Sequence, residues 1–334
     1  IYPSCVMCRF YRMLVFIATI VHNGRICGSD SYFHSFVSST LNLVGYKPCW
    51  KSHLLHDKPA LEIKALVKKH MFGQHIAADV AVKAVLGHIF NDRPKKALTL
   101  SFHGWTGCGK NHLANLIVQG LYKDGSASPY VHHFVGSRDI NKYFKQQYFK
   151  TEEFQNDIEN RLRRCERSLF IFDEVEFMDP DSLNALKPFL EYHEHNAADL
   201  SRYAIFIFLA NTGATDISQI TLDHFKSGLP RESLALKNFE KVVSSSSFNE
   251  KGGYSGSILI KSGLVDHFVP FLPLEKKHVL LCVTADPLSR HLSSAKINAV
   301  VDSLSFKPDD LQIYSETGCK RVQQKLILEL HDEL

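Results

Sequence analysis

An apolar strand that runs into a glycine-rich loop and then into a helix constrains the fold of this chain more than any other feature. The strand is Leu98–His103, the helix is Lys110–Leu121, and the loop between them has the Walker A form G-x4-G-K. Glycines let backbone N–H groups turn inward around a phosphate, and the following helix points its positive end at the same anion. We therefore predict that the loop binds the phosphates of a nucleotide. Its residues are Gly104, Trp105, Thr106, Gly107, Cys108, Gly109, Lys110 and Asn111.

The last two residues of the loop carry the chemistry expected at the phosphates. Lys110 would reach the outer phosphates and offset their charge. Walker A normally ends in Ser or Thr, whose hydroxyl ligates Mg²⁺, whereas this loop ends in Asn111. Because an amide oxygen can also ligate Mg²⁺, we expect Asn111 to be a metal ligand with altered geometry. The loop predicts ATP and Mg²⁺ as cofactors.

A second motif supplies the acidic groups that hydrolysis requires. The apolar run Ser168-Leu169-Phe170-Ile171-Phe172 ends in Asp173 and Glu174, which is a Walker B pattern. Asp173 would hold Mg²⁺, and Glu174 would orient or deprotonate the attacking water. A binding-only descendant would be expected to have lost Glu174, so its presence favours catalysis.

The rest of the chain alternates apolar strands with helices. The pattern predicts further strands over residues 130–135, 168–173, 203–210 and 267–274, and helices over residues 152–165 and 181–192. Continuous apolar strands that alternate with helices are typical of a parallel sheet covered on both faces. We therefore predict an α/β fold, with a five-stranded parallel sheet in a nucleotide-binding domain over residues 59–274. Residues 275–334, called the lid below, are expected to contain helices only, and the serine run 244–247 is expected to be a surface loop.

Charge argues against one class of partner. The formal net charge is +4, from 39 basic and 35 acidic residues. So mild an excess does not indicate a dedicated nucleic-acid surface. We therefore expect no nucleic-acid partner.

Both ends of the sequence suggest a secretory route. Residues 1–58 are irregular apart from an apolar run at residues 13–21, which Arg9 and Arg12 precede; this is the pattern of a signal peptide. The alternative is a buried strand near the N-terminus. The last four residues, His331-Asp332-Glu333-Leu334, form an address for retention in the endoplasmic reticulum. Together the two features predict a luminal protein.

Several of these segments resemble the torsins, a family of AAA+ ATPases. Gly104–Asn111 resembles the torsin Walker A, whose final Asn is a family trait, and Ile171–Glu174 resembles the torsin Walker B. Gly318-Cys319-Lys320 resembles the torsin sensor 2, where Lys replaces the Arg of most AAA+ proteins. The resemblance runs from about residue 61 to about residue 326. It implies an AAA+ P-loop domain followed by a small helical lid.

The resemblance also implies roles for further residues. Asn211, which follows the fourth predicted strand, would be sensor 1 and position the water near the γ-phosphate. Lys320 would approach that phosphate from the lid, and Phe72 and Gly73 would lie against the adenine. Arg231 is the nearest candidate for an arginine finger, but we interpret it as structural, because such fingers often act from a partner.

Partners and location follow from the resemblance alone. Torsins lie in the lumen of the endoplasmic reticulum and of the nuclear envelope, where they associate peripherally with membranes. They hydrolyse ATP weakly until a membrane-anchored activator docks its luminal domain and supplies an arginine finger. The resemblance therefore implies a chaperone-like ATPase that remodels protein or membrane assemblies. It also implies that the chain can form a homo-oligomer.

Cysteines are numerous for a chain of this size. There are eight, at positions that form no zinc signature. The torsin resemblance implies that Cys282 and Cys319, both in the lid, form a redox-sensitive pair. The alternative is two unrelated buried thiols.

Two other functions remain open on the sequence alone. The first is a nucleotide-gated scaffold that binds ATP and partners with little turnover; Asn111 favours it and Glu174 opposes it. The second is a nucleic-acid motor or clamp loader, which would share this fold. The mild charge and the C-terminal tetrapeptide oppose the second.

Overall fold

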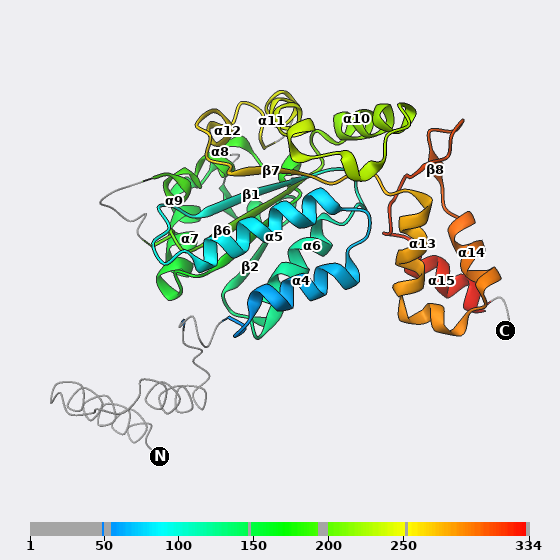
Figure 1. Cartoon of the computed structure of the whole chain (residues 1–334). Coiled ribbons are helices and arrows are strands. Elements are labelled where there is room, and N and C mark those ends of the chain that lie inside the picture. Colours follow the sequence, from blue (N-terminus) through cyan, green and yellow to red (C-terminus); the bar gives the residue numbers. More distant parts are fainter. Residues whose placement is uncertain (1–48, 50–54, 146–147, 193–199, 251–252, 332–334) are drawn as a thin grey trace, which may run out of the picture. The chain divides into compact units, whose positions relative to one another are not determined.

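The computed structural model describes residue 49 and residues 55–145, 148–192, 200–250 and 253–331 (Figure 1). The apolar run 13–21 and residues 332–334 lie outside the described residues, so the predictions made for them stay predictions. In chain order the helices and strands are α4 (Pro59–His70), α5 (His75–Phe90), β1 (Leu98–His103), α6 (Lys110–Leu121), β2 (Val131–Val135), β3 (Phe144–Lys145), β4 (Tyr148–Phe149), α7 (Thr151–Arg164), β5 (Leu169–Asp173), α8 (Pro180–Asn184), α9 (Lys187–Leu190), β6 (Ile205–Ala210), α10 (Ala214–Lys226), α11 (Glu240–Asn249), α12 (Ile258–Lys261), β7 (His267–Pro270), α13 (Lys276–Ala285), α14 (Ser294–Asp302), β8 (Phe306–Lys307), β9 (Tyr314–Ser315) and α15 (Val322–His331).

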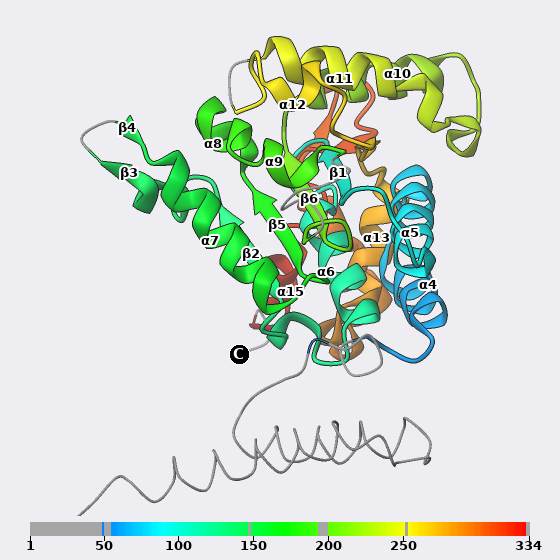
Figure 2. The same cartoon turned by 90° about the vertical axis from the view of Figure 1, so that its left-hand side faces the viewer.

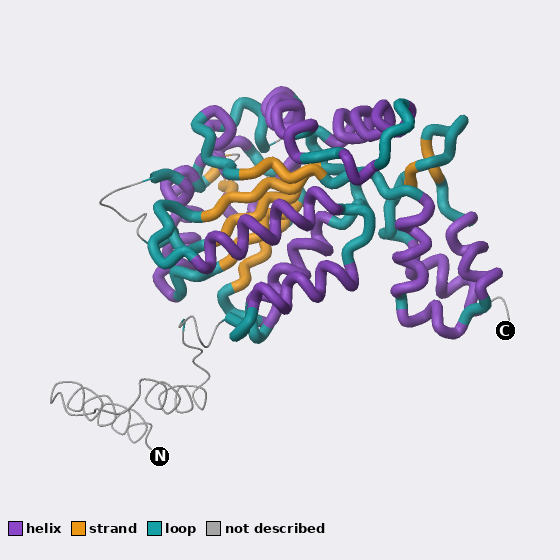
Figure 3. The backbone as a smooth tube through the Cα atoms, in the orientation of Figure 1, coloured by secondary structure: helices purple, strands orange, loops and turns teal. Residues whose placement is uncertain are grey.

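Five strands form one parallel sheet in the order β2-β5-β6-β1-β7. This confirms the predicted α/β fold. β1 lies between β6 and β7, so the chain passes from one side of β1 to the other after β6; the sheet is orange in Figure 3. In open α/β sheets, ligands bind outside the carboxyl ends of the strands at such a switch point. The glycine-rich loop follows the carboxyl end of β1 and therefore lies at this point.

One face of the sheet is packed with aromatic side chains. Because successive side chains of a strand point to opposite faces, Phe170 and Phe172 of β5 share a face with Phe206 and Phe208 of β6. The ring centroids lie 4.8 Å apart for Phe170 and Phe206 and 5.2 Å apart for Phe172 and Phe208. Side chains of α7, α8 and α9 complete this cluster, so these helices cover the aromatic face.

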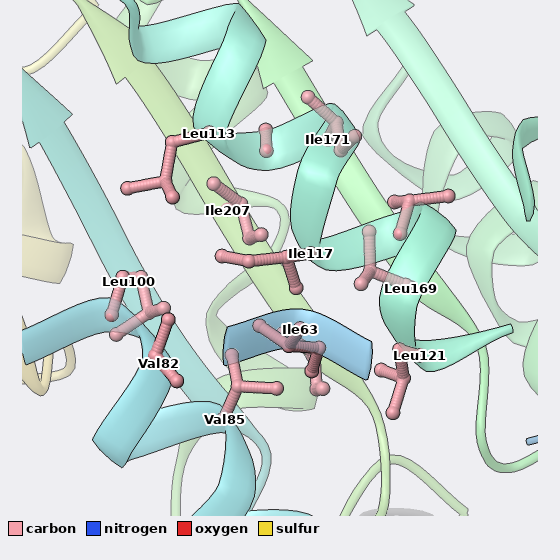
Figure 4. Packing of buried hydrophobic residues seen from close by; sticks show 14 of the residues in the cluster. Ile63, Val82, Val85, Leu100, Leu113, Ile117, Leu121, Leu169, Ile171 and Ile207 are labelled. Atoms are coloured by element: carbon pink, nitrogen blue, oxygen red, sulfur yellow. The ribbon is translucent and has the colours of Figure 1, made fainter. Parts of the chain in front are cut away.

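The opposite face is aliphatic and is covered by α4, α5 and α6. Figure 4 shows Leu100, Ile171 and Ile207 of the strands meeting Ile117 of α6 and Val85 of α5. Figure 2 shows α5 and α7 on opposite sides of the strands. The sheet is thus buried on both faces, as its continuous apolar strands predicted.

Three of the predictions made for residues 59–274 need correction. The helix predicted over residues 181–192 is divided into α8 and α9, because Pro188 has no backbone N–H to continue the first helix. The last strand ends at Pro270 instead of residue 274. Pro273 lies in the segment that was wrongly included in the strand. The serine run is not a surface loop: it lies within α11, and Ser247 is fully buried.

The lid has an apolar core of its own. Val279 and Val283 of α13 pack with Val301 of α14 and Leu326 of α15. The prediction that this region contains helices only is wrong, because β8 and β9 pair as an antiparallel hairpin. Strands of two residues are too short to leave a periodic pattern in the sequence.

Two disulfides cross-link the described part of the chain. Cys282 of α13 bonds to Cys319, and Cys49 bonds to Cys165, the residue that caps α7. The second pair spans a sequence separation of 116. No helix among the described residues has the length and apolar character needed to cross a bilayer.

Candidate nucleotide site

The glycine-rich loop is folded tightly between β1 and α6. Gly104, Gly107 and Gly109 all have positive φ, a region that favours glycine. A Cβ on Gly104 would lie 2.6 Å from the carbonyl oxygen of Phe271, and one on Gly107 would lie 1.8 Å from that of Thr317. Larger residues are therefore excluded from both positions.

Lys110 is held by neutral oxygen atoms. Its Nζ donates to the carbonyl oxygens of Gly104 and Trp105, the second at 3.0 Å, and to Oδ1 of Asn211 at 2.8 Å. Phosphate oxygens are stronger acceptors for an ammonium group than these neutral atoms are. The lysine predicted to bind phosphate can thus exchange its present partners for an anion.

Asp173 and Asn111 lie together, as a shared metal site requires. Nδ2 of Asn111 donates to Oδ2 of Asp173 at 2.8 Å, and the N–H of Glu174 donates to Oδ1 of Asp173 at 2.9 Å. Since Asn111 uses its nitrogen here, its Oδ1 stays available to a cation. Mg²⁺ is usually bound by one or two carboxylates together with substrate phosphates. The residues present fit Mg²⁺ held in that way.

Glu174, the residue after β5, directs its carboxylate toward the loop after β2. It has a φ of 56°, unusual for a residue other than glycine, and its Oε2 accepts a hydrogen bond from the hydroxyl of Ser137. Gly136, next to Ser137, lies so close that a Cβ there would be 2.5 Å from the carbonyl oxygen of Glu174. The loop after β2 therefore determines where this carboxylate points.

Asn211 lies at the carboxyl end of β6, where it contacts both the glycine-rich loop and the turn after the Walker B strand β5. Its Oδ1 accepts from Lys110 of the glycine-rich loop. Its Nδ2 and its backbone N–H both donate to the carboxylate of Glu176, which lies in a short 3₁₀ turn after β5. Glu176 was not among the site residues predicted from the sequence, although a third acidic residue in Asp173-Glu174-Val175-Glu176 was a visible signal.

A buried polar network supports this edge of the sheet. His103, the last residue of β1, is fully buried; its Nδ1 lies 3.1 Å from the carbonyl oxygen of Thr212 and its Nε2 lies 2.7 Å from the Ser101 hydroxyl. Ser101 in turn contacts the hydroxyl of Tyr254 at 2.7 Å. Burial lowers the pKa of His103 to about 4, so the ring is neutral at physiological pH. The network joins β1 to Thr212, the residue after Asn211.

The segment predicted to lie against adenine is fixed by Gln74, which was not among the predicted site residues. Gln74 is buried; its Nε2 donates to the carbonyl oxygens of Cys108 and Leu272, and its Oε1 accepts from the N–H of Leu272. Gly73 packs under the ring of His278 in the lid, where a Cβ would lie 2.7 Å from the ring. Gln74 therefore ties the Phe72-Gly73 segment to the glycine-rich loop.

Arg231 is enclosed by its own chain. It is 7% exposed, its Nη2 donates to the carbonyl oxygen of Gly73 at 2.7 Å, and its Nη1 lies 3.3 Å from Oε1 of Glu275. These contacts join the adenine segment to the first residues of the lid. They agree with the interpretation of Arg231 as structural.

The segment predicted to be sensor 2, Gly318-Cys319-Lys320, contacts the glycine-rich loop directly. The N–H of Cys319 donates to the carbonyl oxygen of Gly107 at 3.2 Å. A groove of about 480 Å³ lies beside this contact, and Lys320 is one of the cations that line it. The full lining is Thr106, Thr317, Lys320, Arg321, Gln324, Lys325 and Leu328. An anion in this groove would thus face cations of the lid.

The structure brings most of the predicted site residues to one edge of the sheet. Lys110, Asn111, Asp173 and Asn211 are linked by direct hydrogen bonds or lie in adjoining pairs, whereas Glu174 is held to one side by Ser137. Phe72 and Gly73 lie where α4 ends and α5 begins, beside the lid.

Comparisons with known proteins place the chain in a family. A family model described as Torsin matches residues 46–172, and one described as Torsin-1A, C-terminal domain matches residues 274–328. A "Torsin-like protein" of Caenorhabditis elegans is 40% identical over 269 residues, covering 78% of this chain and 74% of the relative. The first match spans the glycine-rich loop and ends at Phe172, one residue before Asp173, and the second spans Gly318-Cys319-Lys320.

Among solved structures the chain is similar to Hsp104. For the ADP complex of the S. cerevisiae protein the TM-score is 0.56 at 17% identity, covering 89% of this chain and 52% of that chain. For a closed state with ATPγS and FITC-casein the TM-score is 0.53 at 16% identity, covering 89% and 50%. This chain thus spans about half the length of the Hsp104 chains. At such low identity the likeness concerns the AAA+ fold alone.

Proposed function

The chain belongs to the torsin family of AAA+ ATPases, and from that premise we propose that it hydrolyses ATP, with Mg²⁺, to remodel protein or membrane assemblies. The observation that carries the proposal is a pair of hydrogen bonds between side chains at the carboxyl edge of the sheet. There Lys110 of the glycine-rich loop contacts Asn211, and Asn111 contacts Asp173. These side chains match the groups that phosphoryl transfer to water requires.

Each of these residues has a separate task in the proposed reaction. Lys110 leaves its carbonyl partners to neutralise the outer phosphates. Asp173 and Asn111 would hold Mg²⁺, which when bound offsets the charge that develops on the phosphates. Glu174 accepts a proton from the attacking water once it turns from Ser137.

An activator is part of the proposal. Arg231 is bound to Gly73 and Glu275 inside its own chain, so it does not reach out to a neighbouring site. Torsins need an arginine from a partner. We therefore propose that a membrane-anchored luminal activator supplies that arginine, and that the chain associates peripherally with the membrane, alone or as a homo-oligomer.

The proposed location is the lumen of the endoplasmic reticulum and the nuclear envelope. Two disulfides support it, because such bonds persist in oxidising compartments. Deletion of residues 331–334 should send part of the protein into the medium of expressing cells. A cytosolic pool, detected by protease protection of intact microsomes, would contradict this location.

Phosphate release by the full chain, with and without the luminal domain of a candidate activator, tests the activity. We expect slow release alone and stimulation by the activator. The alternative, a nucleotide-gated scaffold, predicts ATP binding with no turnover under either condition. Affinity capture with Glu174→Gln, which should hold ATP without hydrolysing it, would enrich the activator and identify it.

A further inference from the structure

Glu176 occupies a position beside the reacting centre that the Walker motifs do not account for. One of its carboxylate oxygens accepts from Nδ2 of Asn211, and the other accepts from the backbone N–H of Asn211 at 3.3 Å. On the other side of the same amide, Oδ1 of Asn211 accepts from Nζ of Lys110 at 2.8 Å. The three side chains form a continuous row of hydrogen bonds across the site.

The chemistry of the two end groups determines how the Asn211 amide is oriented. An ammonium group can only donate hydrogen bonds, and an ionised carboxylate can only accept them. The amide between them satisfies both only with its oxygen toward Lys110 and its nitrogen toward Glu176. We propose that Glu176 is a positioning residue that holds the oxygen of Asn211, and not its nitrogen, toward the phosphates.

This orientation changes what sensor 1 can do, provided the proposed ATPase function holds. When ATP draws Lys110 to its phosphates, Oδ1 of Asn211 is left as a free acceptor at the site. An acceptor takes a hydrogen bond from the attacking water; it cannot donate one to the γ-phosphate. Asn211 therefore orients the water, while the proton passes to Glu174.

The surroundings keep both residues in place. Glu176 is half-buried in the 3₁₀ turn Val175–Phe177, whose first residue is fully buried beneath the sheet. The residue after Asn211 is held through its carbonyl oxygen, which lies 3.1 Å from Nδ1 of His103. Sensor 1 is thus fixed by the Walker B turn on one side and by the strand of the glycine-rich loop on the other.

Glu176→Gln in the full chain tests the proposal. Both groups that the carboxylate binds are donors, and an amide offers one acceptor and one donor. The Gln amide can keep only one of these two bonds; when its oxygen takes the backbone N–H, the Asn211 side chain reverses and brings its nitrogen toward Lys110. We expect the rate of phosphate release in single turnover to fall by about 100-fold, the lower end of the loss seen when one oriented polar group is removed from an active site. ATP affinity should stay within about threefold, because the phosphate contacts of Lys110 are retained. Glu152→Gln, an exposed site on α7, is the matched control.

A double variant separates orientation from structural support. With Asp at position 211 and Gln at position 176, the Gln amide donates to one Asp oxygen and accepts from the backbone N–H, while the other Asp oxygen faces Lys110. The net charge of the pair equals that of the wild type. We therefore expect Glu176→Gln combined with Asn211→Asp to hydrolyse ATP at least about tenfold faster than Glu176→Gln alone.

Three results would overturn the proposal. They are a wild-type rate in Glu176→Gln, a parallel loss of ATP binding in that variant, or no recovery in the double variant when both variants keep the wild-type thermal midpoint. Failure of the ATPase function itself looks different. If the wild type binds ATP without turnover, the scaffold alternative is favoured and the positioning role falls with the enzyme.

Discussion

The backbone N–H of Cys319 donates a hydrogen bond to the carbonyl oxygen of Gly107, with 3.2 Å between nitrogen and oxygen. This bond joins the turn that carries sensor 2 to the middle of the phosphate-binding loop. The lid and the loop therefore touch backbone to backbone, with no long side chain between them. A movement of the lid at Cys319 would therefore act directly on the glycine-rich loop.

Gly318→Ala should weaken ATP binding by displacing the lid. Gly318 has a φ of 52°, and a Cβ there would lie 2.1 Å from the carbonyl oxygen of Gly107. Gly263 has a similar φ of 63° but open space around it, so Gly263→Ala is a matched control with the same backbone strain and no clash. We expect ATP affinity, measured with a fluorescent analogue, to fall about tenfold or more in Gly318→Ala, a loss of about 1.4 kcal/mol. Equal affinities in the two variants would contradict contact between lid and loop.

Lys110→Ala should remove ATP binding. No other lysine or arginine within the described residues is hydrogen-bonded to the glycine-rich loop, and charge-assisted contacts to phosphate contribute about 1.5–3 kcal/mol. The expected loss is about a hundredfold or more in affinity, measured by calorimetry. Unchanged affinity would rule out the assignment of the loop.

Glu174→Gln should separate binding from chemistry. The amide cannot accept a proton from water, so hydrolysis should be lost while ATP affinity is kept. Because the variant does not hydrolyse its bound ATP, its complex with the activator should persist when ATP is present. Hydrolysis at the wild-type rate in the presence of the activator would exclude Glu174 as the base. Ser137→Ala is an informative companion, since it frees this carboxylate without changing its charge.

Acid should destabilise the protein through His103. Burial lowers the pKa of this histidine from its ordinary value of 6.5 to about 4. As the pH falls, the unfolded chain therefore binds the proton first. The stabilisation that comes from the neutral His103 is fully present above pH 6.5 and is lost progressively as the pH falls from 6.5 toward 4. At pH 5.5 the free energy of unfolding should be lower by about 1.4 kcal/mol.

Urea unfolding at pH 7.5 and pH 5.5 measures this effect. Between pH 7.5 and pH 5.5, the free energy of unfolding of the wild type should fall by about 1.4 kcal/mol more than that of His103→Gln, because Gln does not titrate. His132 and His278, whose pKa values burial also lowers to about 4, contribute equally to both proteins and cancel in the difference. Identical pH dependence in His103→Gln would show that His103 does not contribute.

The sequence was most informative where the chemistry depends on neighbours in the chain. Walker A and Walker B each place their functional groups within a few residues of one strand end, so the positions of Lys110 and Asp173 could be predicted before the fold was known. The alternation of strands and helices predicted the parallel sheet for the same reason. Hydrophobic periodicity is a local signal.

Contacts between distant segments could not be predicted in this way. Glu176 reaches Asn211 because a 3₁₀ turn folds back beside a strand that comes 35 positions later. The bond between Cys49 and Cys165 spans a separation of 116, and several pairings were open to eight cysteines. Gln74 depends on two loops that only the folded sheet brings together. Such contacts follow from the assembled fold and leave no local pattern.

The disulfide between Cys282 and Cys319 should couple redox state to ATP affinity. It joins α13, whose His278 covers the adenine segment at Gly73, to the residue whose N–H holds Gly107. The bridge therefore links the lid elements that contact the two ends of the nucleotide site. Reduction allows these elements to move separately, so ATP affinity should change on reduction.

Coupling between sites is reciprocal, so ATP should in turn shift the reduction potential of the pair. The measurement is ATP affinity in dithiothreitol and in oxidised buffer, for the wild type and for Cys282→Ser. We expect the wild type to differ between the two buffers by about 5-fold or more, the usual lower range for coupled sites. Cys282→Ser should show no difference, while reduction of Cys49–Cys165 remains possible in both proteins and serves as the internal control. Equal affinities of the oxidised and reduced wild type would make the bridge purely structural, and free thiols at both positions in the oxidised protein would exclude it.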